Sequence, residues 1–499
     1  MGPKDGRSPG NLRRSVRPTS FATNQGFRRL PPSGGRDTIR RMTTTRGRRS
    51  DATSLPPRPR SSPLRNFDPI WLLAVNMGVI GFMWVRHGGL ARIGGLGDSL
   101  IAIGQLAGLY AAVGLLLGLL LASRTPWLER RYGMDRMIHA HRLVGFTTVW
   151  LVIAHVVLIV VGFALAARIS LWEQIVDTVV NHPYVAQAVV GFVLILVVAG
   201  MSVRAVRRAI SYEAWWFVHI SAYAAVALVF GHQTAIGADF VLDRWAWVYW
   251  SLLYLSVAYL IFVYRWVAPL FRAWQHRFRV EEVIDEGPGV VTLVIGGRRL
   301  DAFRVQAGQF FLLRALTRGR WWKAHPFSLS GAPDGSTLRF TIKALGDDST
   351  DLQTIPVGTR FALEGPYGGF LAHLPTDRRM LFIAGGIGIT PFRGFIDDLD
   401  RPTDIALIYR NPGPDDTVFH DDLVRLAAEK GFDLHLSYSR FPGGGPNPFD
   451  PKRLRALVPD IAEREVFVIG SLRLIDAARS GLRGAGVPTR RIHLENFAY

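Results

Sequence analysis

The sequence predicts a multidomain protein in which a six-helix transmembrane bundle precedes an antiparallel six-stranded β-barrel and an α/β domain, all behind a disordered basic tail. Three observations predict this order. Six apolar runs lie between residues 68 and 264, short alternating strands follow them, and the C-terminal part alternates strands with helices. A hydrophobic fraction of 49% and a mean hydropathy of +0.17 agree with several membrane spans in a chain of 499 residues.

The N-terminal segment, residues 1–66, is predicted to be disordered. It carries sixteen Lys or Arg against three Asp, so it holds +13 of the net charge of +20, and it shows no apolar periodicity. Three interpretations stay open: a solvated cytoplasmic tail that helps to set orientation, an anchor to anionic lipid, or a nucleic-acid arm. We expect no nucleic-acid partner, because +13 of the net charge of +20 lies in this tail. The first apolar run also starts too late for a cleavable signal peptide.

Six apolar runs each approach the roughly 20 residues that a helix needs to cross a bilayer. They are Asp68–Val85, Ser99–Ala122, Met137–Ala167, Tyr184–Val203, Tyr212–His232 and Trp245–Tyr264. Arginines cluster after the second and fourth runs, as Arg124, Arg130, Arg131 and Arg136 and as Arg204, Arg207 and Arg208. By the positive-inside rule, this is a multi-pass protein of the cell membrane with both termini cytoplasmic. The third and fifth runs then cross in the same direction.

Four histidines occur at matched positions in the third and fifth runs. His141 and His219 lie near the cytoplasmic ends, and His155 and His232 lie further out. Buried imidazoles are costly without a partner, so two pairs in parallel helices point to metal or haem ligands. At 1.5 Å per residue the two levels are about 20 Å apart, enough to stack two flat macrocycles. His139 lies on roughly the opposite side of the helix from His155 and drops out.

Helix geometry supports the two pairs unequally. A separation of 14 residues returns His155 to within about 40° of the face of His141. A separation of 13 residues leaves His232 off the face of His219, unless the helix is over-wound or ends near Gly231. Geometry alone therefore does not secure His232.

The histidines leave three explanations open at this point. They could be satisfied structural residues, metal or haem ligands, or a histidine relay in a metal or proton transporter. The sequence contains no cysteine, which excludes disulfides, thiolate zinc sites and cysteine-ligated iron–sulfur clusters. Electron transfer, if the protein performs it, would therefore need haem or an organic cofactor.

After Tyr264 the sequence changes to short apolar segments separated by Gly, Pro and Asp, the pattern of an antiparallel barrel. The six expected strands are Phe278–Ile284, Val290–Ile295, Gln309–Ala315, Phe327–Leu329, Leu338–Ala344 and Arg360–Glu364. Residues 265–276 form a basic, aromatic connector suited to the membrane surface.

The C-terminal part alternates strands with helices, which predicts a parallel α/β sheet of the Rossmann-like type. Gly385, Gly386 and Gly388 follow its first strand and let the backbone approach a phosphate. Thr390 is the expected N-cap and Pro391 the first helical residue, so that the helix N-terminus would face an anion. The tight turn could also be purely structural, but the surrounding strands favour a dinucleotide.

Five motifs from this region occur together and in order. They are AGQF at Ala307–Phe310, HPFSLS at His325–Ser330, GPYG at Gly365–Gly368, AGGIGITP at Ala384–Pro391 and ENF at Glu495–Phe497. They resemble the ferredoxin–NADP reductase superfamily, and with the four histidines the chain is similar to the transmembrane flavocytochromes of the NADPH oxidase and ferric reductase family. The resemblance covers roughly residues 68–499. It implies a membrane domain at 67–266, an FAD-binding barrel at 275–375 and an NAD(P)-binding domain at 376–499.

The resemblance implies an NAD(P)H-dependent membrane oxidoreductase with FAD and two b-type haems. It assigns the inner haem to His141 and His219 and the outer haem to His155 and His232. The expected partners are membrane lipid, NAD(P)H and a small extracytoplasmic acceptor, either a metal chelate such as ferric iron or O2 giving superoxide. Two alternatives remain: a flavin reductase on a haem-free membrane anchor that feeds a partner protein, and a histidine-relay transporter regulated by nucleotide.

The resemblance also assigns the flavin site. His325, Pro326, Phe327 and Ser328 would hold the flavin and its phosphates, and Ser328 and the C-terminal aromatic Phe497 would take the catalytic positions. The other cofactor positions are Lys343, Gly346 and Thr350 for the FAD pyrophosphate, Gly385, Gly386, Gly388 and Thr390 for the nucleotide, and Gly470 beside the nicotinamide.

Nucleotide choice and acceptor choice depend on single residues. Arg410 and Arg440 could meet a 2′-phosphate, which favours NADPH, although NADH stays possible. The family's Cys-Gly-Pro turn is replaced here by Ile469-Gly470-Ser471, and Tyr499 extends past the aromatic that is terminal in oxidases. Ile159 stands where oxidases place a polar residue beyond the outer ligand, which weakens the oxygen-reducing interpretation.

Overall fold

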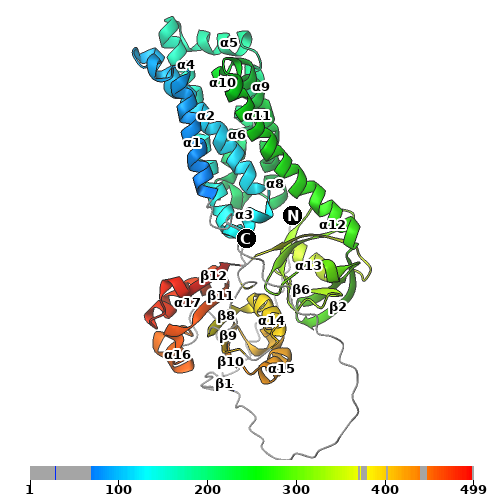
Figure 1. Ribbon diagram of the computed structural model, residues 1–499. Helices are drawn as coiled ribbons and strands as arrows, with labels where there is room; N and C mark the ends of the chain where they lie inside the picture. The colour runs from blue at the N-terminus through cyan, green and yellow to red at the C-terminus, as the bar shows by residue number, and fades with distance from the viewer. Residues whose placement is uncertain are drawn as a thin grey trace, which may run out of the picture.

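The computed structural model describes residues 28–29, 69–368, 371, 379–400, 403–438 and 447–496. A helical bundle leads through a long helix into a β-barrel-like part, and an α/β part follows (Figure 1). The predicted residues Arg440, Phe497 and Tyr499, and the predicted tail apart from Arg28–Arg29, lie outside the described residues.

The first part of the described chain is helical, and five of its helices are long and apolar enough to cross a membrane. The helices are α1 (Pro69–Arg86), α2 (Leu96–Ala122), α3 (Pro126–Tyr132), α4 (Met134–Ala167), α5 (Leu171–Asn181), α6 (Val185–Ser202), α7 (Arg204–Ala209), α8 (Tyr212–Ile220), α9 (Ala222–Ile236), α10 (Ala238–Val241), α11 (Arg244–Ile261) and α12 (Ala268–His276). The first predicted span forms a shorter apolar helix, Trp71–Arg86, so the count of six spans stays a prediction.

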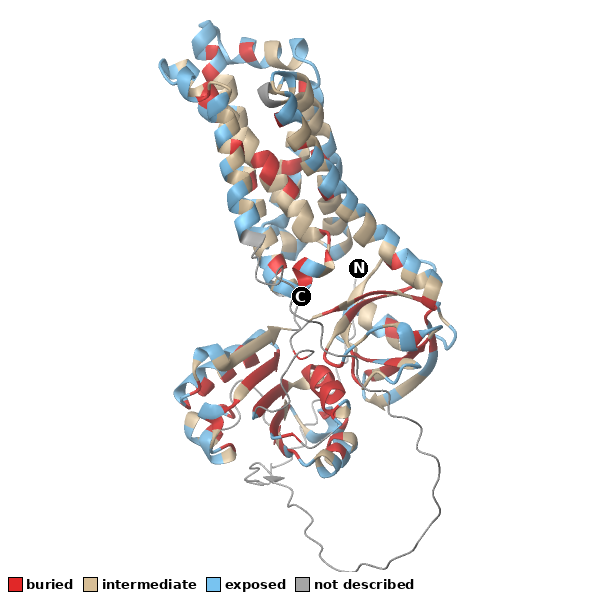
Figure 2. Cartoon of the chain, viewed as in Figure 1, coloured by how far each residue is buried: buried red, intermediate tan, exposed pale blue. Residues whose placement is uncertain are grey.

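The outer surface of the bundle is apolar. Much of it is exposed or half-buried in Figure 2, and large side chains such as Phe146, Trp150 and Leu255 are more than half exposed. Such a surface is stable in lipid, because the surface contains few polar groups and the backbone groups are hydrogen-bonded within the helices. The chain is therefore a membrane protein.

Helices α2 and α4 pack closely along their length because glycines line their contact. A Cβ atom added to Gly104 would lie 3.0 Å from the Leu158 side chain, and one added to Gly162 would lie 2.9 Å from the Ile101 nitrogen. Small residues that let two backbones approach are typical of membrane helix pairs. This packing fixes α4, which carries His141 and His155, against α2.

The fifth predicted span is interrupted. Helix α8 ends at Ile220 and α9 begins at Ala222, with Ser221 between them donating its hydroxyl to Val218 O at 2.6 Å. Ser221 N also donates to Val218 O, three residues earlier, at 3.1 Å, so the chain is locally over-wound between His219 and His232, which was one of the two expectations. The other expectation, a helix end near Gly231, was wrong, because α9 continues to Ile236. The break comes two residues after His219 and lies between the two histidines of this span.

Helix α5 was not predicted, and helix α12 was predicted only as part of a connector. Helix α5 lies across the far end of the bundle (Figure 1) and begins with a capping box between Ser170 and Glu173. The predicted connector is helical: a π-helical turn, Phe262–Val267, continues α11 into α12. Exposed Phe271 and Trp274 on α12 suit the interface between lipid and water.

Strands form at all six positions expected for the barrel. They are β2 (Arg279–Gly287), β3 (Val290–Gly296), β4 (Phe310–Ala315), β5 (His325–Ser328), β6 (Thr337–Lys343) and β7 (Phe361–Tyr367), with helix α13 (Asp347–Gln353) between the last two. They make two three-stranded antiparallel sheets, β2-β3-β6 and β5-β4-β7. Isolated bridges, Arg279 to Arg360 and Leu329 to Phe340, link the edges of the two sheets around a core that includes Phe278 and Phe311.

The α/β part is a six-stranded sheet in the order β1-β10-β9-β8-β11-β12. Its elements are β1 (Arg28–Arg29), β8 (Met380–Gly385), α14 (Thr390–Asp397), β9 (Ile405–Asn411), α15 (His420–Lys430), β10 (Asp433–Tyr438), α16 (Pro451–Leu457), β11 (Glu465–Gly470), α17 (Leu472–Gly484) and β12 (Ile492–Asn496). All pairs are parallel except β1 with β10. The strand order reverses between β8 and β11, where open α/β sheets bind their ligands.

Candidate functional site

The structure brings the four predicted histidines together as two pairs. The ring centroids of His141 and His219 are 5.9 Å apart, and those of His155 and His232 are 6.4 Å apart. When two imidazoles bind the same metal ion from opposite sides, each at about 2 Å, their ring centroids lie roughly 6 Å apart. Both pairs therefore have the spacing of two ligands on opposite sides of one metal ion.

Carbonyl groups of α2 orient the two histidines of α4. His141 Nδ1 lies 3.0 Å from Gly118 O, and His155 Nδ1 lies 2.8 Å from Gly104 O. Such a contact fixes the ring and leaves Nε2 as the nitrogen for a metal. The two glycines are 14 residues apart, as are the two histidines. This matching period was a sequence signal for the partner helix that the prediction missed.

The remaining histidines differ in their surroundings. Among the described residues, neither His219 Nδ1 nor His232 Nδ1 has a hydrogen-bond partner, and both atoms are buried. The Trp215 ring stacks on the His219 ring at 4.8 Å. Within the described residues, no group of three or more His, Asp or Glu side chains could hold a metal ion. A donor set of two opposed imidazoles suits haem, whose macrocycle supplies the other four nitrogens. The histidines present therefore fit two haems better than a bare ion.

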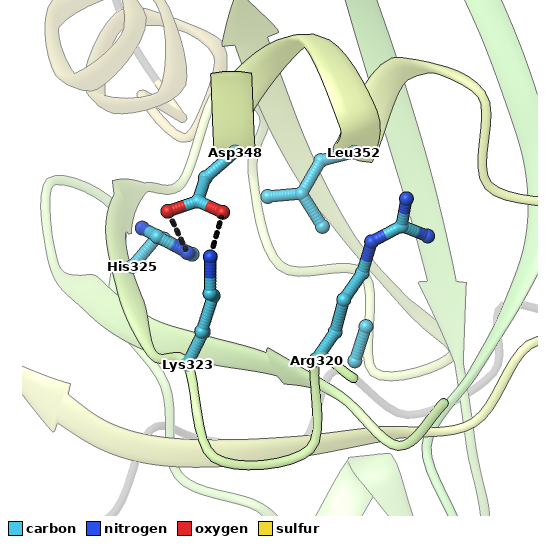
Figure 3. Close-up of a pocket in the computed structure, with 6 residues that line it drawn as sticks. Arg320, Lys323, His325, Asp348 and Leu352 are labelled. Carbon is cyan, nitrogen blue, oxygen red and sulfur yellow. Dashed lines mark hydrogen bonds and ion pairs between the residues drawn. The ribbon is translucent and has the colours of Figure 1, made fainter. Parts of the chain in front are cut away.

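His325 opens β5, the strand assigned to flavin, and lies in a small pocket with Arg320, Lys323, Asp348 and Leu352 (Figure 3). His325 Nε2 is 3.8 Å from Asp348 Oδ2. Burial lowers the pKa of His325, although the Asp348 carboxylate opposes that shift. A neutral imidazole at pH 7 can then donate or accept a hydrogen bond from a cofactor.

The other residues of the flavin motif lie along the same strand. Pro326 is exposed, whereas Phe327 and Ser328 are half-buried, with Ser328 paired to Phe310 of β4. The bridge from Leu329 to Phe340 places β5 beside β6, the strand that ends at Lys343. The structure thus brings Lys343 to the edge on which the HPFS residues lie.

Gly346 and Thr350, predicted for the pyrophosphate, flank the start of α13. Gly346 is the N-cap residue, and the Thr350 hydroxyl donates to Gly346 O at 3.0 Å. Both residues are exposed. Their contact keeps the segment after Lys343 folded back on itself, close to the strand that carries the lysine.

The predicted nucleotide residues gather at the ends of adjacent strands. Gly385 at the end of β8 pairs with Arg410 of β9, and Gly470 ends β11 on the other side of β8. Gly386 has φ +54°, a conformation that favours glycine, and a Cβ atom on Gly388 would lie 2.7 Å from Ile469 O. Burial lowers the pKa of Arg410. The glycine-rich turn, Arg410 and Gly470 therefore lie at the ends of three adjacent strands.

The expected N-cap role of Thr390 was wrong. A short 3₁₀ turn, Gly386–Ile389, leads directly into α14, so Thr390 already has helical dihedral angles. Its buried hydroxyl donates to Ile387 O at 3.1 Å instead of capping the helix. Pro391 is the second residue of α14 and not the first, as had been expected, although it still lies in the first turn. The four-residue turn explains the shift, because its last residue, Ile389, takes the N-cap position in place of Thr390.

Arg393 joins the nucleotide turn to the flavin strand. Its side chain is buried, its Nη1 donates to Ser330 O at 2.6 Å, and it pairs with Asp422 of α15. Asp397, one turn later in α14, accepts from Ala332 N at 3.1 Å. The glycine-rich turn and the HPFS strand are therefore held together by one helix, which the sequence reasoning did not identify.

A buried carboxylate joins the membrane helices to the barrel. Glu364 of β7 pairs with Arg314 at 2.6 Å and with Arg124 of the loop after α2. Glu129 of α3 accepts from Gly368 N at 2.7 Å, and burial raises the pKa of Glu129. These contacts connect the loop between the second and third predicted spans with the strand that ends in the GPYG motif.

Replacing Glu364 by Gln is expected to destabilise the folded protein by about 2 kcal/mol, because two arginines would lose a partner that is 4% exposed. Thermal unfolding of the detergent-solubilised protein measures the change. The matched control is Asp351→Asn, which breaks a more exposed pair with Arg320 and should cost less than about 0.5 kcal/mol. Equal losses in the two variants would contradict the structural role given to Glu364.

Comparison with known proteins places two kinds of component in this chain. Residues 107–230 match the family model "Ferric reductase like transmembrane component". Over 240 residues the chain is 31% identical to an NADPH oxidoreductase of Mycobacterium tuberculosis, and this match covers 46% of the chain and 62% of that protein. It is 26% identical over 239 residues to a glycine betaine monooxygenase reductase subunit of Chromohalobacter salexigens, covering 45% of the chain and 64% of that protein. The chain thus spans under two thirds of the length of these relatives.

Among solved structures, the chain is similar to the flavohem-like FAD/NAD-binding domain of nitric oxide dioxygenase from Vibrio cholerae. The identity is 22% and the TM-score 0.39, over 44% of this chain and 97% of that domain. A ferredoxin-NADP+ reductase from Plasmodium falciparum matches at 17% identity and a TM-score of 0.38, over 44% of this chain and 95% of that protein.

Proposed function

Because this chain joins a ferric reductase-like transmembrane component to a ferredoxin-reductase-type FAD/NAD-binding module, we propose that it carries electrons from cytosolic NAD(P)H, through FAD and two b-type haems, to an acceptor on the outer side of the membrane. The observation that carries this proposal is the pair of opposed histidine rings at each of two levels in the bundle. Both termini would then be cytoplasmic in the cell membrane.

Each group of residues has its own part in this proposal. FAD, when bound, accepts two electrons together and releases them singly, and haem takes one electron at a time. His141 and His219 would hold the inner haem, and His155 and His232 the outer one. Gly118 and Gly104 carbonyls fix two of these rings, so that their Nε2 atoms stay directed away from α2.

The flavin and nucleotide would meet between the barrel and the α/β sheet. The HPFS strand from His325 to Ser328, with Lys343, would bind FAD in a domain at 275–375. The glycine-rich turn and Gly470 would bind NAD(P)H in a domain at 376–499, behind a membrane domain at 67–266. Phe497, which follows the described end of β12, would stack on the flavin. The buried Arg393 contact with Ser330 O supports this arrangement, because it ties the two binding segments together.

Arg410 is expected to select NADPH. Replacing it by Ala should lower kcat/KM for NADPH about 10- to 100-fold, since a charge-assisted hydrogen bond to the 2′-phosphate contributes about 1.5–3 kcal/mol. The value for NADH should change little, because NADH lacks that phosphate. Steady-state kinetics with both nucleotides measure the ratio. Equal losses for the two nucleotides would remove Arg410 from the specificity site.

The proposed function is tested by spectroscopy followed by turnover. Dithionite-reduced purified protein should show the α band of low-spin b-type haem, and NADPH should produce the same band without oxygen. Superoxide and ferrous iron are then measured side by side, aerobically and anaerobically with ferric chelates. Superoxide without iron reduction marks an oxidase, and anaerobic turnover with ferric chelate marks a metal reductase.

A second candidate is a flavin reductase on a haem-free membrane anchor that passes electrons to a partner protein. The similarity to monooxygenase reductase subunits favours it, because those relatives are named as parts of larger enzymes. Absence of the haem band, together with NADPH oxidation that needs an added acceptor protein, would select this candidate over the first.

A further inference from the structure

Helix α8, which carries His219, is in direct contact with the loop between β4 and β5. The Trp322 ring of this loop lies 5.6 Å from the ring of Trp216 and 5.6 Å from the ring of Phe217. Aromatic pairs at this separation stabilise a contact by more than the burial of their surface area alone. A segment of the barrel is thus seated on the membrane helix within one turn of the inner histidine.

Lys323, the next residue of the loop, makes an ionic contact to each side. Its Nζ lies 2.9 Å from Glu213 Oε1 of α8 and 2.7 Å from Asp348 Oδ1 of α13. Figure 3 shows Lys323 and His325 both directed at Asp348. The two carboxylates, that of Asp348 first, raise the pKa of Lys323, and its side chain is 20% exposed. The lysine is charged at pH 7 and holds a membrane helix and a barrel helix together.

Along the sequence, the residues of this contact lie next to both the flavin strand and the inner histidine His219. The flavin strand β5 begins at His325, two residues after Lys323, and His219 lies two residues after Phe217. Trp215, on the same helix, stacks on the His219 ring. Any shift of the loop against α8 therefore moves the flavin strand relative to the inner histidine.

We propose that Trp322 and Lys323 are positioning residues that set the separation between the flavin-binding strand and the inner histidine pair. This inference rests on the proposed function, because it gives that pair and the flavin strand an electron-transfer role. Breaking the contact should leave NADPH reduction of the flavin unchanged, since the nucleotide turn and Arg393 lie elsewhere. Electron transfer from the flavin to the inner haem should slow.

Amide hydrogen exchange on the full-length protein in lipid nanodiscs tests the contact without using electron transfer. In Lys323→Met, exchange at residues 212–220 and 316–324 should rise about tenfold, equivalent to about 1.4 kcal/mol. Glu213→Gln, which alters only the membrane side, should raise exchange in the same two segments. Lys323→Arg should restore protection, because it keeps the charge between the two carboxylates. The matched control is Arg320→Met, which breaks a pair with Asp351 inside the barrel and should leave residues 212–220 unchanged.

Anaerobic single-turnover mixing with NADPH supplies the second measurement. In Trp322→Leu and Glu213→Gln, flavin absorbance should fall at the wild-type rate, while the haem α band should appear about tenfold more slowly. Unchanged exchange and an unchanged haem rate in all three variants would overturn the inference, even if NADPH reduces the haems. If amide exchange rises in the variants but the purified protein shows no haem band, the contact is confirmed and the proposed electron-transfer function is wrong.

Discussion

Replacing His219 by alanine is expected to remove the inner haem and to abolish electron transfer across the membrane. His219 faces His141 at 5.9 Å between ring centroids, and the described structure offers no third side chain to replace it. An iron with one imidazole ligand in an apolar bundle is held weakly, because half of its protein ligands are gone. The dithionite-reduced α band should fall to that of one haem, and NADPH should no longer reduce an outside acceptor.

The controls for this substitution come from the same helices. His139→Ala should keep both haems, because His139 is exposed and takes no part in either pair. FAD content should be unchanged in His219→Ala, since the flavin strand lies in the barrel. Two haems in purified His219→Ala, measured as the pyridine haemochrome per protein, would show that the ligand assignment is wrong.

Local sequence patterns predicted the helices and strands but not the contacts between them. Apolar runs located the long helices, and alternating segments located the strands β2 to β7, because side-chain burial repeats with a period that one segment already contains. The interruption at Ser221 was missed, since it depends on one hydroxyl that bonds Val218 O. The Thr390 error has the same origin: a four-residue turn shifted the start of a helix that sequence locates only within a few residues.

The contacts that join the modules had no signal within any one segment. Lys323 and Glu213 are 110 positions apart, and Arg124 and Glu364 are 240 positions apart. Charged residues are common near the ends of membrane helices, so neither ion pair could be predicted from one sequence. The histidine pairs were predictable because both members of each pair stand out against apolar helices. Their carbonyl partners at Gly104 and Gly118 were predictable only through the shared period of 14 residues.

The two contacts between bundle and barrel constrain different membrane elements. Lys323 reaches the helix that carries His219, whereas Glu364 reaches the loop that follows α2, the helix whose carbonyls orient His141 and His155. Helix α8, which carries His219, and helix α2, which orients His141, are thus both connected to the barrel. A change at either contact should therefore alter the inner pair before the outer pair, which lies further from the barrel.

Replacing Gly388 by valine is expected to block the entry of electrons while leaving the membrane part intact. A Cβ atom at this position would lie 2.7 Å from Ile469 O and 3.0 Å from Ile469 C, which are backbone atoms of the neighbouring strand β11. Backbone in the middle of a parallel sheet cannot move aside, so the glycine-rich turn must shift away from the nucleotide. NADPH-dependent reduction of the flavin should slow about 100-fold, equivalent to about 2.7 kcal/mol.

The spectrum reduced by dithionite separates this effect from general misfolding. It should match that of the wild type in Gly388→Val, because dithionite reduces haem without the nucleotide site. Gly413→Ala is the control, two residues after the end of β9: its added Cβ would meet Asp416 Oδ2 at 3.6 Å, and its φ is −153°. NADPH should reduce the control at the wild-type rate. Wild-type flavin reduction in Gly388→Val would instead mean that the nucleotide binds away from the strand ends of β8 and β11, and the Ile469-Gly470-Ser471 segment would then have no part in hydride transfer.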